Sequence, residues 1–230
     1  MRGLGTVVNV VTVLAGTLAG LVIGRRFPER VRTTLLSGVG LVVLVIGFDE
    51  ARVTRNVIFP LVAIVLGGLV GELLDIEGAL ESLGDGIKAR VARGDGQNRF
   101  VEGFVSASLI FCVGPLAVLG SVQDGLHGDH QLLFVKAGLD GLVALILAST
   151  LGWGVALSAL VVAAYQGGLT AVAGVADRVL SDRMVLEMTA TGGVMVIGIG
   201  IRLLDLRPLR VASFLPALVI APVAVGLFAR

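Results

Sequence analysis

Long apolar runs recur along this chain and are separated by short segments that hold most of its charged residues. Each run approaches the roughly 20 residues that a helix needs to cross a ~30 Å hydrocarbon core. The runs lack the alternation of period two that a membrane β-barrel requires. The pattern therefore predicts an all-α, polytopic membrane protein with about eight helical spans. We place these spans at residues 4–24, 33–48, 57–74, 102–122, 131–151, 153–175, 185–204 and 211–229.

Basic residues between the runs indicate an orientation, because cytoplasmic loops of membrane proteins are enriched in Lys and Arg. With the N-terminus outside, the inner loops hold most of these residues and the outer loops hold few. The inner set is Arg25, Arg26, Arg30, Arg32, Lys88, Arg90, Arg93, Arg99, Arg202, Arg207 and Arg210, and the outer set is Arg52, Arg55, Arg178 and Arg183. We therefore predict that the N-terminus lies outside. No small-residue cleavage site follows the first run, so we expect it to be a span and not a signal peptide.

Composition also favours a lipid bilayer as the surroundings of the chain. Hydrophobic residues make up 56% of it and charged residues 15%, with a mean hydropathy of +0.98, whereas soluble domains carry about 25% charge. A net charge of +1 with dispersed basic residues argues against a nucleic-acid partner. The sequence contains no HExxH, GxSxG, P-loop or CxxC motif, so we expect neither an enzyme nor a cofactor. His127 and His130 have no neighbouring Cys or Glu, so no metal site is predicted.

Two parts of the sequence resemble each other at an offset of 153 residues. The matching pairs are Arg25 and Arg178, Arg30 and Arg183, Gly40 and Gly193, and Gly47 and Gly200. We interpret spans 1–3 and 6–8 as two copies of one three-helix unit. The first and sixth spans are an odd number of crossings apart, so the two copies would run in opposite directions. Inverted-topology repeats around broken helices are an architecture of many secondary transporters.

This repeat divides the chain into four segments. Residues 1–75 are the first three-helix repeat, and residues 153–230 are the second, inverted one. Residues 76–99 begin with an apolar stripe that has charged residues around it, a pattern typical of an amphipathic helix in the membrane interface. Residues 100–152 are a central segment that contains a broken helix.

Polar and helix-breaking residues are concentrated in the central segment and in the span that follows it. Gly114-Pro115 interrupts an apolar run, and the proline ring frees a backbone carbonyl one turn earlier. Asp140 lies about nine residues into its span, or ~14 Å deep, and Gln166 lies at a comparable level. We expect these groups to meet in a polar cavity that binds a small solute or ion. The candidate binding residues are Ser106, Ser108, Gly114, Pro115, Asp124, Lys136, Asp140, Ser149, Thr150, Tyr165 and Gln166.

Each of these features also has a structural explanation. Lys136 and Asp140 share one helix face at i, i+4 and can simply neutralise each other in lipid. Alternatively, Asp140 binds a proton or cation and Lys136 modulates it. The Gly114-Pro115 break can be a packing kink without a ligand. Asp124 can be a gate residue or a cap for the turn that follows it.

Gly16, Gly20 and Gly24 recur at four-residue spacing in the first span. Such a stripe of small residues lets another helix approach closely. We expect that helix to belong to the same chain, and a seam between two copies is the alternative. For the assembly we predict a homo-oligomer, most simply a dimer.

Four stretches, FVSASLIFCVGPLAVLGSVQDGL, LLFVKAGLDG, YQGGLTAVAG and GGLVGELLDIEGALESLG, are specific in their composition and order. Together they resemble the bacterial domain-of-unknown-function 554 family of inner-membrane proteins, and the resemblance covers nearly the whole chain. It implies a multi-helix fold in a bacterial inner membrane. It implies no catalytic or binding residues.

Three functions are compatible with the sequence. Our first hypothesis is a secondary transporter of a small polar solute or ion, in which Asp140 takes a coupling proton or cation. The second is a passive channel, in which the same polar level lines a continuous pore. The third is a non-transporting membrane scaffold, which expects fully paired polar groups and no hydrated cavity.

Overall fold

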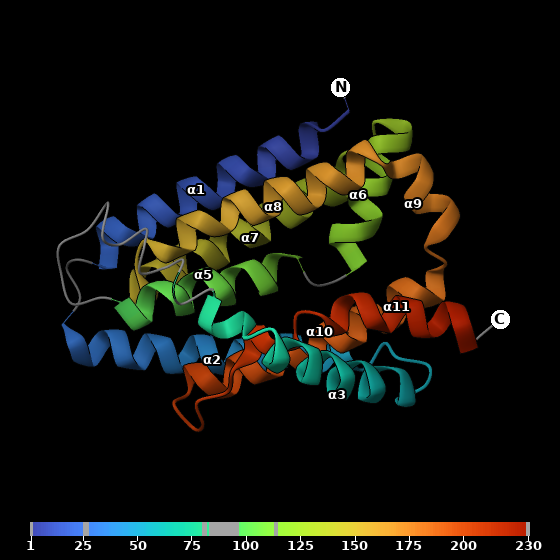
Figure 1. Cartoon of the computed structure of the whole chain (residues 1–230). Helices are drawn as coiled ribbons and strands as arrows, with labels where there is room; N and C mark the ends of the chain where they lie inside the picture. Colours follow the sequence, from blue (N-terminus) through green and yellow to red (C-terminus); the bar gives the residue numbers. More distant parts are fainter. Residues whose placement is uncertain (1, 25–27, 80–81, 83–96, 113–114, 229–230) are drawn as a thin grey trace.

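The computed structural model of the chain describes residues 2–24, 28–79, 82, 97–112 and 115–228, and every regular element in these residues is helical (Figure 1). Apolar side chains dominate each long element, which is why these segments form helices that cover their own backbone polar groups. The elements are α1 (Leu4–Gly24), α2 (Glu29–Ala51), α3 (Ile58–Leu73), α5 (Gln97–Cys112), α6 (Pro115–His127), α7 (Gln131–Leu151), α8 (Gly154–Ala171), α9 (Ala173–Val179), α10 (Asp182–Leu203), the 3₁₀ helix η1 (Val211–Phe214) and α11 (Ala217–Phe228).

The predicted helical membrane fold is confirmed. Six described segments are long and apolar enough to cross a bilayer, namely α1, residues 33–51 of α2, α7, α8, α10, and η1 with α11. Helices α5 and α6 form one more such segment, which is bent by 60° where the sequence predicts a broken helix. Helix α3 is a shorter apolar helix at the position of the third predicted span. The predicted boundary near Gly152 is also confirmed, since α7 ends there in a residue with a φ of +86°.

The helix ends gather at two faces of the molecule. The N-terminal face carries Gly3, the loop of residues 52–57, Gly128 and Ser181, and it lies on the right of Figure 1. The opposite face carries Pro28, Gly152 and residues 204–210. Of the described basic residues, Arg30 is at the start of α2, and Arg202, Arg207 and Arg210 are at or after the end of α10, where the chain reaches the opposite face. Arg52 and Arg55 follow α2, and Arg178 and Arg183 flank the connection between α9 and α10, at the N-terminal face. This grouping is the one that the predicted topology assumes, and which face is outside stays a prediction.

The helices form two bundles. The α1 bundle consists of α1, α5, α6, α7, α8 and α9, and the α10 bundle consists of α2, α3, α10, η1 and α11. Packing is extensive within each bundle, above all between α1 and α7 and between α2 and α10. Between the bundles, the main contacts come from α2 against α7 and from α10 against α5 and α6. At this seam, buried apolar side chains of both bundles belong to one hydrophobic core.

Glycines set the close approach of α1 to α7. A Cβ on Gly16 would lie 2.1 Å from the Gly141 carbonyl oxygen, and one on Gly20 would lie 2.2 Å from the Leu145 carbonyl oxygen. The two helices are parallel, because contacts advance in the same direction along both. The prediction that this stripe packs within the chain is confirmed, and the stripe is not available as a seam between two copies.

Helices α2 and α10 are antiparallel and are also joined through glycines. Gly40 faces Gly200 and Gly47 faces Gly193, each pair with a backbone oxygen within 3.3 Å of the position of a missing Cβ. Exchanging Gly40 with Gly193 and Gly47 with Gly200, the residues that match at the offset of 153, turns one contact into the other. Spans 1–3 and 6–8 run in opposite directions in this arrangement. The arrangement is the one that the repeat hypothesis requires, while the internal repeat itself stays a prediction.

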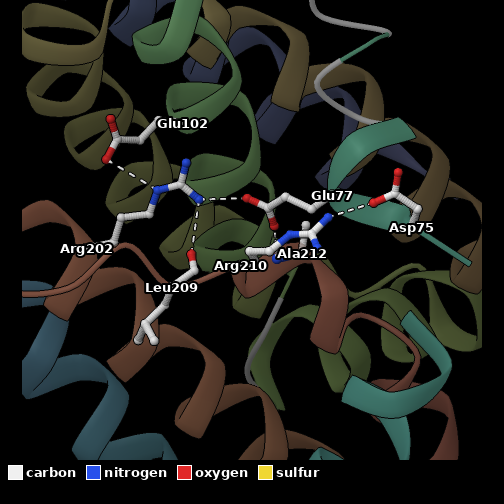
Figure 2. A network of polar contacts seen from close by, with 7 residues as sticks. All are labelled: Asp75, Glu77, Glu102, Arg202, Leu209, Arg210 and Ala212. Carbon is white, nitrogen blue, oxygen red and sulfur yellow. Dashed lines mark hydrogen bonds and ion pairs between the residues drawn. The ribbon is translucent and has the colours of Figure 1, made fainter. Parts of the chain in front are cut away.

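At the opposite face, a network of ion pairs joins the segment after α3 to the end of α10 and the loop that follows it (Figure 2). The Arg202 guanidinium donates to Glu77 Oε1 at 2.8 Å and to the Leu209 carbonyl at 3.2 Å, and Glu77 Oε2 accepts from the Ala212 backbone N–H at 2.9 Å. Glu77 is buried, although it follows directly on an apolar span and could be expected to be solvated at the membrane interface. It pairs with arginine because an unpaired carboxylate would be costly there. Most of the predicted amphipathic helix, which begins beside Glu77, lies outside the described residues.

Candidate functional site

A buried polar cluster joins three helices of the α1 bundle. Asn9 on α1 donates through Nδ2 to Asp140 Oδ2 on α7 at 2.8 Å and to Gln166 Oε1 on α8 at 3.3 Å. Lys136 Nζ donates to the same Asp140 oxygen at 2.5 Å. Asn9 and Gln166 are 0% exposed, and Lys136 and Asp140 are 4% and 5% exposed. We call these four residues the carboxylate cluster.

Helix packing places these four side chains together. Asn9 lies between Gly5, which packs on Leu133 of α7, and Thr12, which packs on Gly141 of α7, so its amide meets a side chain of this parallel helix. Lys136 and Asp140 are one turn apart on α7 and therefore share a face. The cluster holds one ammonium group and one carboxylate, and these neutralise each other. A charge without a partner would be much more costly at this depth.

The cluster does not satisfy all of its own polar atoms. Because a carboxylate only accepts hydrogen bonds, the bond to Asp140 turns the Asn9 amide so that its Oδ1 points away. Asn9 Oδ1 and Gln166 Nε2 are both buried and have no hydrogen-bond partner among the described residues. One free acceptor and one free donor are thus left in the interior, where each unmade hydrogen bond costs about 1–3 kcal/mol.

A cavity of about 590 Å³ lies between the carboxylate cluster and the N-terminal face. We call it the vestibule. Its walls come from the start of α1, the end of α6, the end of α8 and the start of α9, and they include Thr6, Gly167 and Thr170. Thr6 is three residues before Asn9, and Thr170 is four residues after Gln166. The vestibule therefore ends about one helical turn from the cluster on the side of the N-terminal face, which is ~5 Å along the helix axes.

Asp124 caps the first helix. It is fully buried, and its two carboxylate oxygens accept from the backbone N–H groups of Gly3 at 2.9 Å and Gly5 at 3.1 Å. His130 Nδ1 lies 2.9 Å from Asp124 Oδ1. The sequence predicts either a gate residue or a cap for the next turn. The structure instead gives Asp124 the free N–H groups at the start of α1, where a helix has unpaired donors and a positive dipole end.

Ser149 and Thr150 lie apart from the carboxylate cluster, at the end of α7 near the opposite face. Their hydroxyls donate to carbonyls of their own helix, Ser149 to Ile146 at 2.7 Å and Thr150 to Leu147 at 3.0 Å. Serine and threonine often satisfy themselves in this way within helices. Ser106 is buried in α5, and none of the described residues that line the vestibule comes from this helix.

Tyr165 and Ser108 face a different cavity. It measures about 390 Å³, it is lined mainly by apolar side chains of α5, α8, α10 and α11, and it lies at the seam between the two bundles. Tyr165 thus points away from its neighbour Gln166. Ser108 Oγ and Thr189 Oγ1 have no hydrogen-bond partner among the residues that the structure describes. A second apolar cavity, of about 350 Å³, lies at the seam between α2 and α7.

The remaining two predicted residues are at the break between α5 and α6. Pro115 begins α6, in keeping with the preference of proline for the first turn of a helix. Gly114 lies outside the described residues. Of the candidate residues, the structure therefore brings Lys136, Asp140 and Gln166 together.

Asn9, Thr6 and Thr170 are the site residues that sequence reasoning missed. Asn9 carries the one carboxamide in an otherwise apolar first span, and a carboxamide in lipid usually needs a partner on another helix. The sequence alone could therefore have identified Asn9 as a candidate. The two threonines had none, because a threonine in a span commonly bonds to its own helix and carries no information about a cavity.

Comparison with known proteins gives relatives over almost the full length. The chain is 28% identical over 227 residues to "Uncharacterized membrane protein YdfK" of Bacillus subtilis (strain 168), covering 96% of this chain and 95% of that protein. It is 27% identical over 228 residues to "Uncharacterized protein YqgA" of Escherichia coli (strain K12), covering 95% and 94%. No solved structure matches it. The family described as "Protein of unknown function (DUF554)" matches residues 4–226, and the chain belongs to this family.

Proposed function

We propose that this protein is a secondary transporter of a small polar solute or ion, with the carboxylate cluster as its central site. The observation that carries the proposal is the buried set of Asn9, Lys136, Asp140 and Gln166, in which an amide oxygen and an amide N–H lack partners. Charged side chains in the interior of a membrane protein generally mark pathways or proton relays, because their burial is costly. In this role, Asp140 takes a coupling proton or cation, and Lys136 sets its charge state.

The two bundles support a carrier mechanism. Alternating access in many transporters is the rocking of one rigid bundle against another around a fixed site. Here each bundle is tightly packed by glycine contacts, and the seam between them is apolar and has cavities at two places. Because the seam is apolar, lipid chains can fill it when the bundles move apart. Such a movement would therefore expose little polar surface to lipid. Movement of the α10 bundle against the α1 bundle is the conformational change that we propose.

A passive channel is the second candidate. It requires a continuous polar path between the two faces. The vestibule approaches the carboxylate cluster from the N-terminal face, whereas beyond the cluster α1 and α7 are in backbone contact at Gly16, Gly20 and Gly24. This contact favours a carrier. A scaffold role is less well supported, because it expects fully paired polar groups, and two atoms of the cluster are unpaired.

The test is transport by purified protein in liposomes, with Asp140→Asn as the decisive variant. Internal pyranine reports proton movement while gradients of Na⁺, K⁺, urea, glycerol or an amino-acid mixture are imposed in turn. We expect saturable flux of at least one of them with the wild-type chain, and loss of that flux in Asp140→Asn with retained folding in detergent. Wild-type flux in Asp140→Asn would refute the assignment, and unitary currents in planar bilayers would favour a channel.

We further propose a bacterial inner-membrane location with the N-terminus outside, and a homodimer. The excess of basic residues in the predicted inner loops of the sequence supports the orientation. Fusion of alkaline phosphatase and of a fluorescent protein at the N-terminus tests it, because the first is active only outside and the second only inside. Fluorescence of the N-terminal fusion would show that the N-terminus lies inside, contrary to the proposed orientation. Light scattering of the detergent-solubilised protein measures the number of chains.

A further inference from the structure

The vestibule ends in polar groups that lack partners. Thr6 Oγ1 and Thr170 Oγ1 lie in its walls, and both are buried without a hydrogen-bond partner in the described part of the chain. Thr6 is only 7% exposed. One turn deeper, Asn9 Oδ1 and Gln166 Nε2 are also unpaired. Nine buried side-chain polar atoms lack a partner in the described residues, and four of them lie within about two helical turns here, although buried polar groups in proteins are generally bonded.

The unpaired atoms belong to groups without charge. Two are hydroxyls, one is an amide oxygen and one is an amide N–H. The two charges of the cluster, on Lys136 and Asp140, already bond to each other at 2.5 Å. Among the described residues that line the vestibule, the charged one is Arg2, which is exposed at the rim. An ion that reached the floor would therefore find dipoles but no free counter-charge, and such burial is costly.

We propose that the vestibule is a binding site for a small uncharged polar solute that both donates and accepts hydrogen bonds, entered from the N-terminal face. The solute lies against Thr6 and Thr170 in the vestibule wall. Once the helical turn beneath them opens, it donates to Asn9 Oδ1 and accepts from Gln166 Nε2, which do not line the vestibule in this structure. A volume of about 590 Å³ lies within the range of ~300–1,000 Å³ in which small molecules bind. This assignment rests on the proposed transport role of the carboxylate cluster and narrows its substrate class to uncharged solutes.

Two neighbouring glycines on α8 provide a matched pair of variants. A Cβ on Gly167, in the vestibule wall, would have Thr6 Cγ2 at 3.9 Å as its nearest contact, so a larger side chain fits there by filling the cavity. A Cβ on Gly168 would meet nothing within 4 Å, and this residue is exposed on another side of the helix. Gly167→Leu therefore plugs the vestibule, whereas Gly168→Leu adds the same side chain outside it.

The experiment measures thiol modification by the uncharged reagent hydroxyethyl methanethiosulfonate. Cys112 is the single cysteine of the chain, so Cys112→Ala gives a background without thiols. We expect Thr6→Cys to react about tenfold faster or more than Thr17→Cys, since thiol modification requires access. Thr17 is also buried on α1, at 1% exposure against 7% for Thr6, and it is not among the residues that line the vestibule. Adding Gly167→Leu should slow the modification of Thr6→Cys by a similar factor, and adding Gly168→Leu should leave it unchanged.

Matched solutes then test the chemical class. Urea and acetamide should slow the modification of Thr6→Cys severalfold at a non-denaturing concentration, while their charged counterparts guanidinium and acetate should not. Equal modification rates for Thr6→Cys and Thr17→Cys would show that the vestibule does not admit small solutes. Equal protection by charged solutes, or no protection by any solute, would contradict binding of uncharged polar solutes. None of these readouts depends on transport. Failure of flux in liposomes with intact protection would therefore remove the transporter and keep the binding site.

Discussion

Asn9 Nδ2 donates a hydrogen bond of 2.8 Å to Asp140 Oδ2, and so joins the first helix of the chain to the centre of α7 across 131 positions of sequence. The same amide nitrogen also contacts Gln166 on α8. One carboxamide thus links three helices at a level where water is excluded. It also fixes which amide atoms remain free, because the Asp140 carboxylate accepts only hydrogen-bond donors.

Replacing Asn9 by valine should impair both stability and transport. The change removes the links to Asp140 and Gln166, and hydrogen bonds between membrane helices are worth about 0.6–1.7 kcal/mol each. We expect a lower midpoint of thermal unfolding in detergent and loss of solute flux. Thr17→Val on the same helix is the control, because the Thr17 hydroxyl is buried without a partner in the described residues and its removal should be neutral or stabilising. Equal loss in both variants would contradict a specific role for Asn9.

The ion pair of Lys136 and Asp140 allows its structural and functional roles to be separated. Removing one partner leaves a buried charge alone, which typically costs about 3–5 kcal/mol. Lys136→Met and Asp140→Leu should therefore each lower the free energy of unfolding markedly. The double variant, which buries no charge, should recover most of the stability but not the flux. Thermal unfolding and liposome uptake measure the two effects on the same preparations.

Recovery of uptake in the double variant would show that the pair only neutralises itself in lipid. Failure of the double variant to recover stability would show that Asn9 or Gln166 depends on the carboxylate for its own position. Both outcomes are distinct from the expected one.

The fold could be predicted from the sequence to a large extent because lipid imposes a simple rule on it. Long apolar runs must be helices, so the spans, the break near Pro115 and the close packing of the Gly16, Gly20 and Gly24 stripe all followed from residue type and spacing. The division into bundles did not follow. The α10 bundle joins helices from both ends of the chain, the α1 bundle joins α1 to helices from its middle, and pairings such as α2 with α10 depend on contacts that hydropathy does not encode.

The site was only partly predictable. Lys136, Asp140 and Gln166 stand out because their burial in lipid is costly, and they do meet. Tyr165 is adjacent to Gln166 in sequence, but neighbours on a helix point about 100° apart, so it faces the apolar cavity instead. The depth estimated from the sequence put Tyr165 and Gln166 at the same level in the membrane, but it says nothing about the direction in which each side chain points. Rotation about the helix axis, which decides the facing cavity, is set by packing against α1 and α5.

Replacing Asp124 should loosen the start of α1. In Asp124→Ala, the backbone N–H groups of Gly3 and Gly5 lose their acceptor, and loss of a helix cap costs about 0.5–2 kcal/mol. Asp124→Asn should be milder, because its amide oxygen can still accept one of these bonds. Hydrogen exchange of the first turn of α1 reports the effect directly. Unchanged exchange there in Asp124→Ala would refute the capping role, whatever happens to activity.

Replacing Gly20 by alanine should prevent normal packing of α1 on α7. The new Cβ would lie 2.2 Å from the Leu145 carbonyl oxygen and 3.0 Å from the Ala148 side chain, so the helices must separate. Separation would also displace Asn9 from Asp140. Gly38→Ala on α2 is the control, since its Cβ would meet nothing within 4 Å and alanine favours a helix over glycine by about 1 kcal/mol.

We expect Gly20→Ala to lower the yield of monodisperse protein and the midpoint of thermal unfolding, and Gly38→Ala to leave both unchanged or slightly higher. Size-exclusion chromatography with light scattering separates the two explanations of the glycine stripe. Packing within one chain predicts that Gly20→Ala destabilises the protein whatever its oligomeric state. A variant that dissociates to stable, well-folded monomers would instead place the stripe at an interface between copies, and would contradict the α1–α7 contact on which the carboxylate cluster depends.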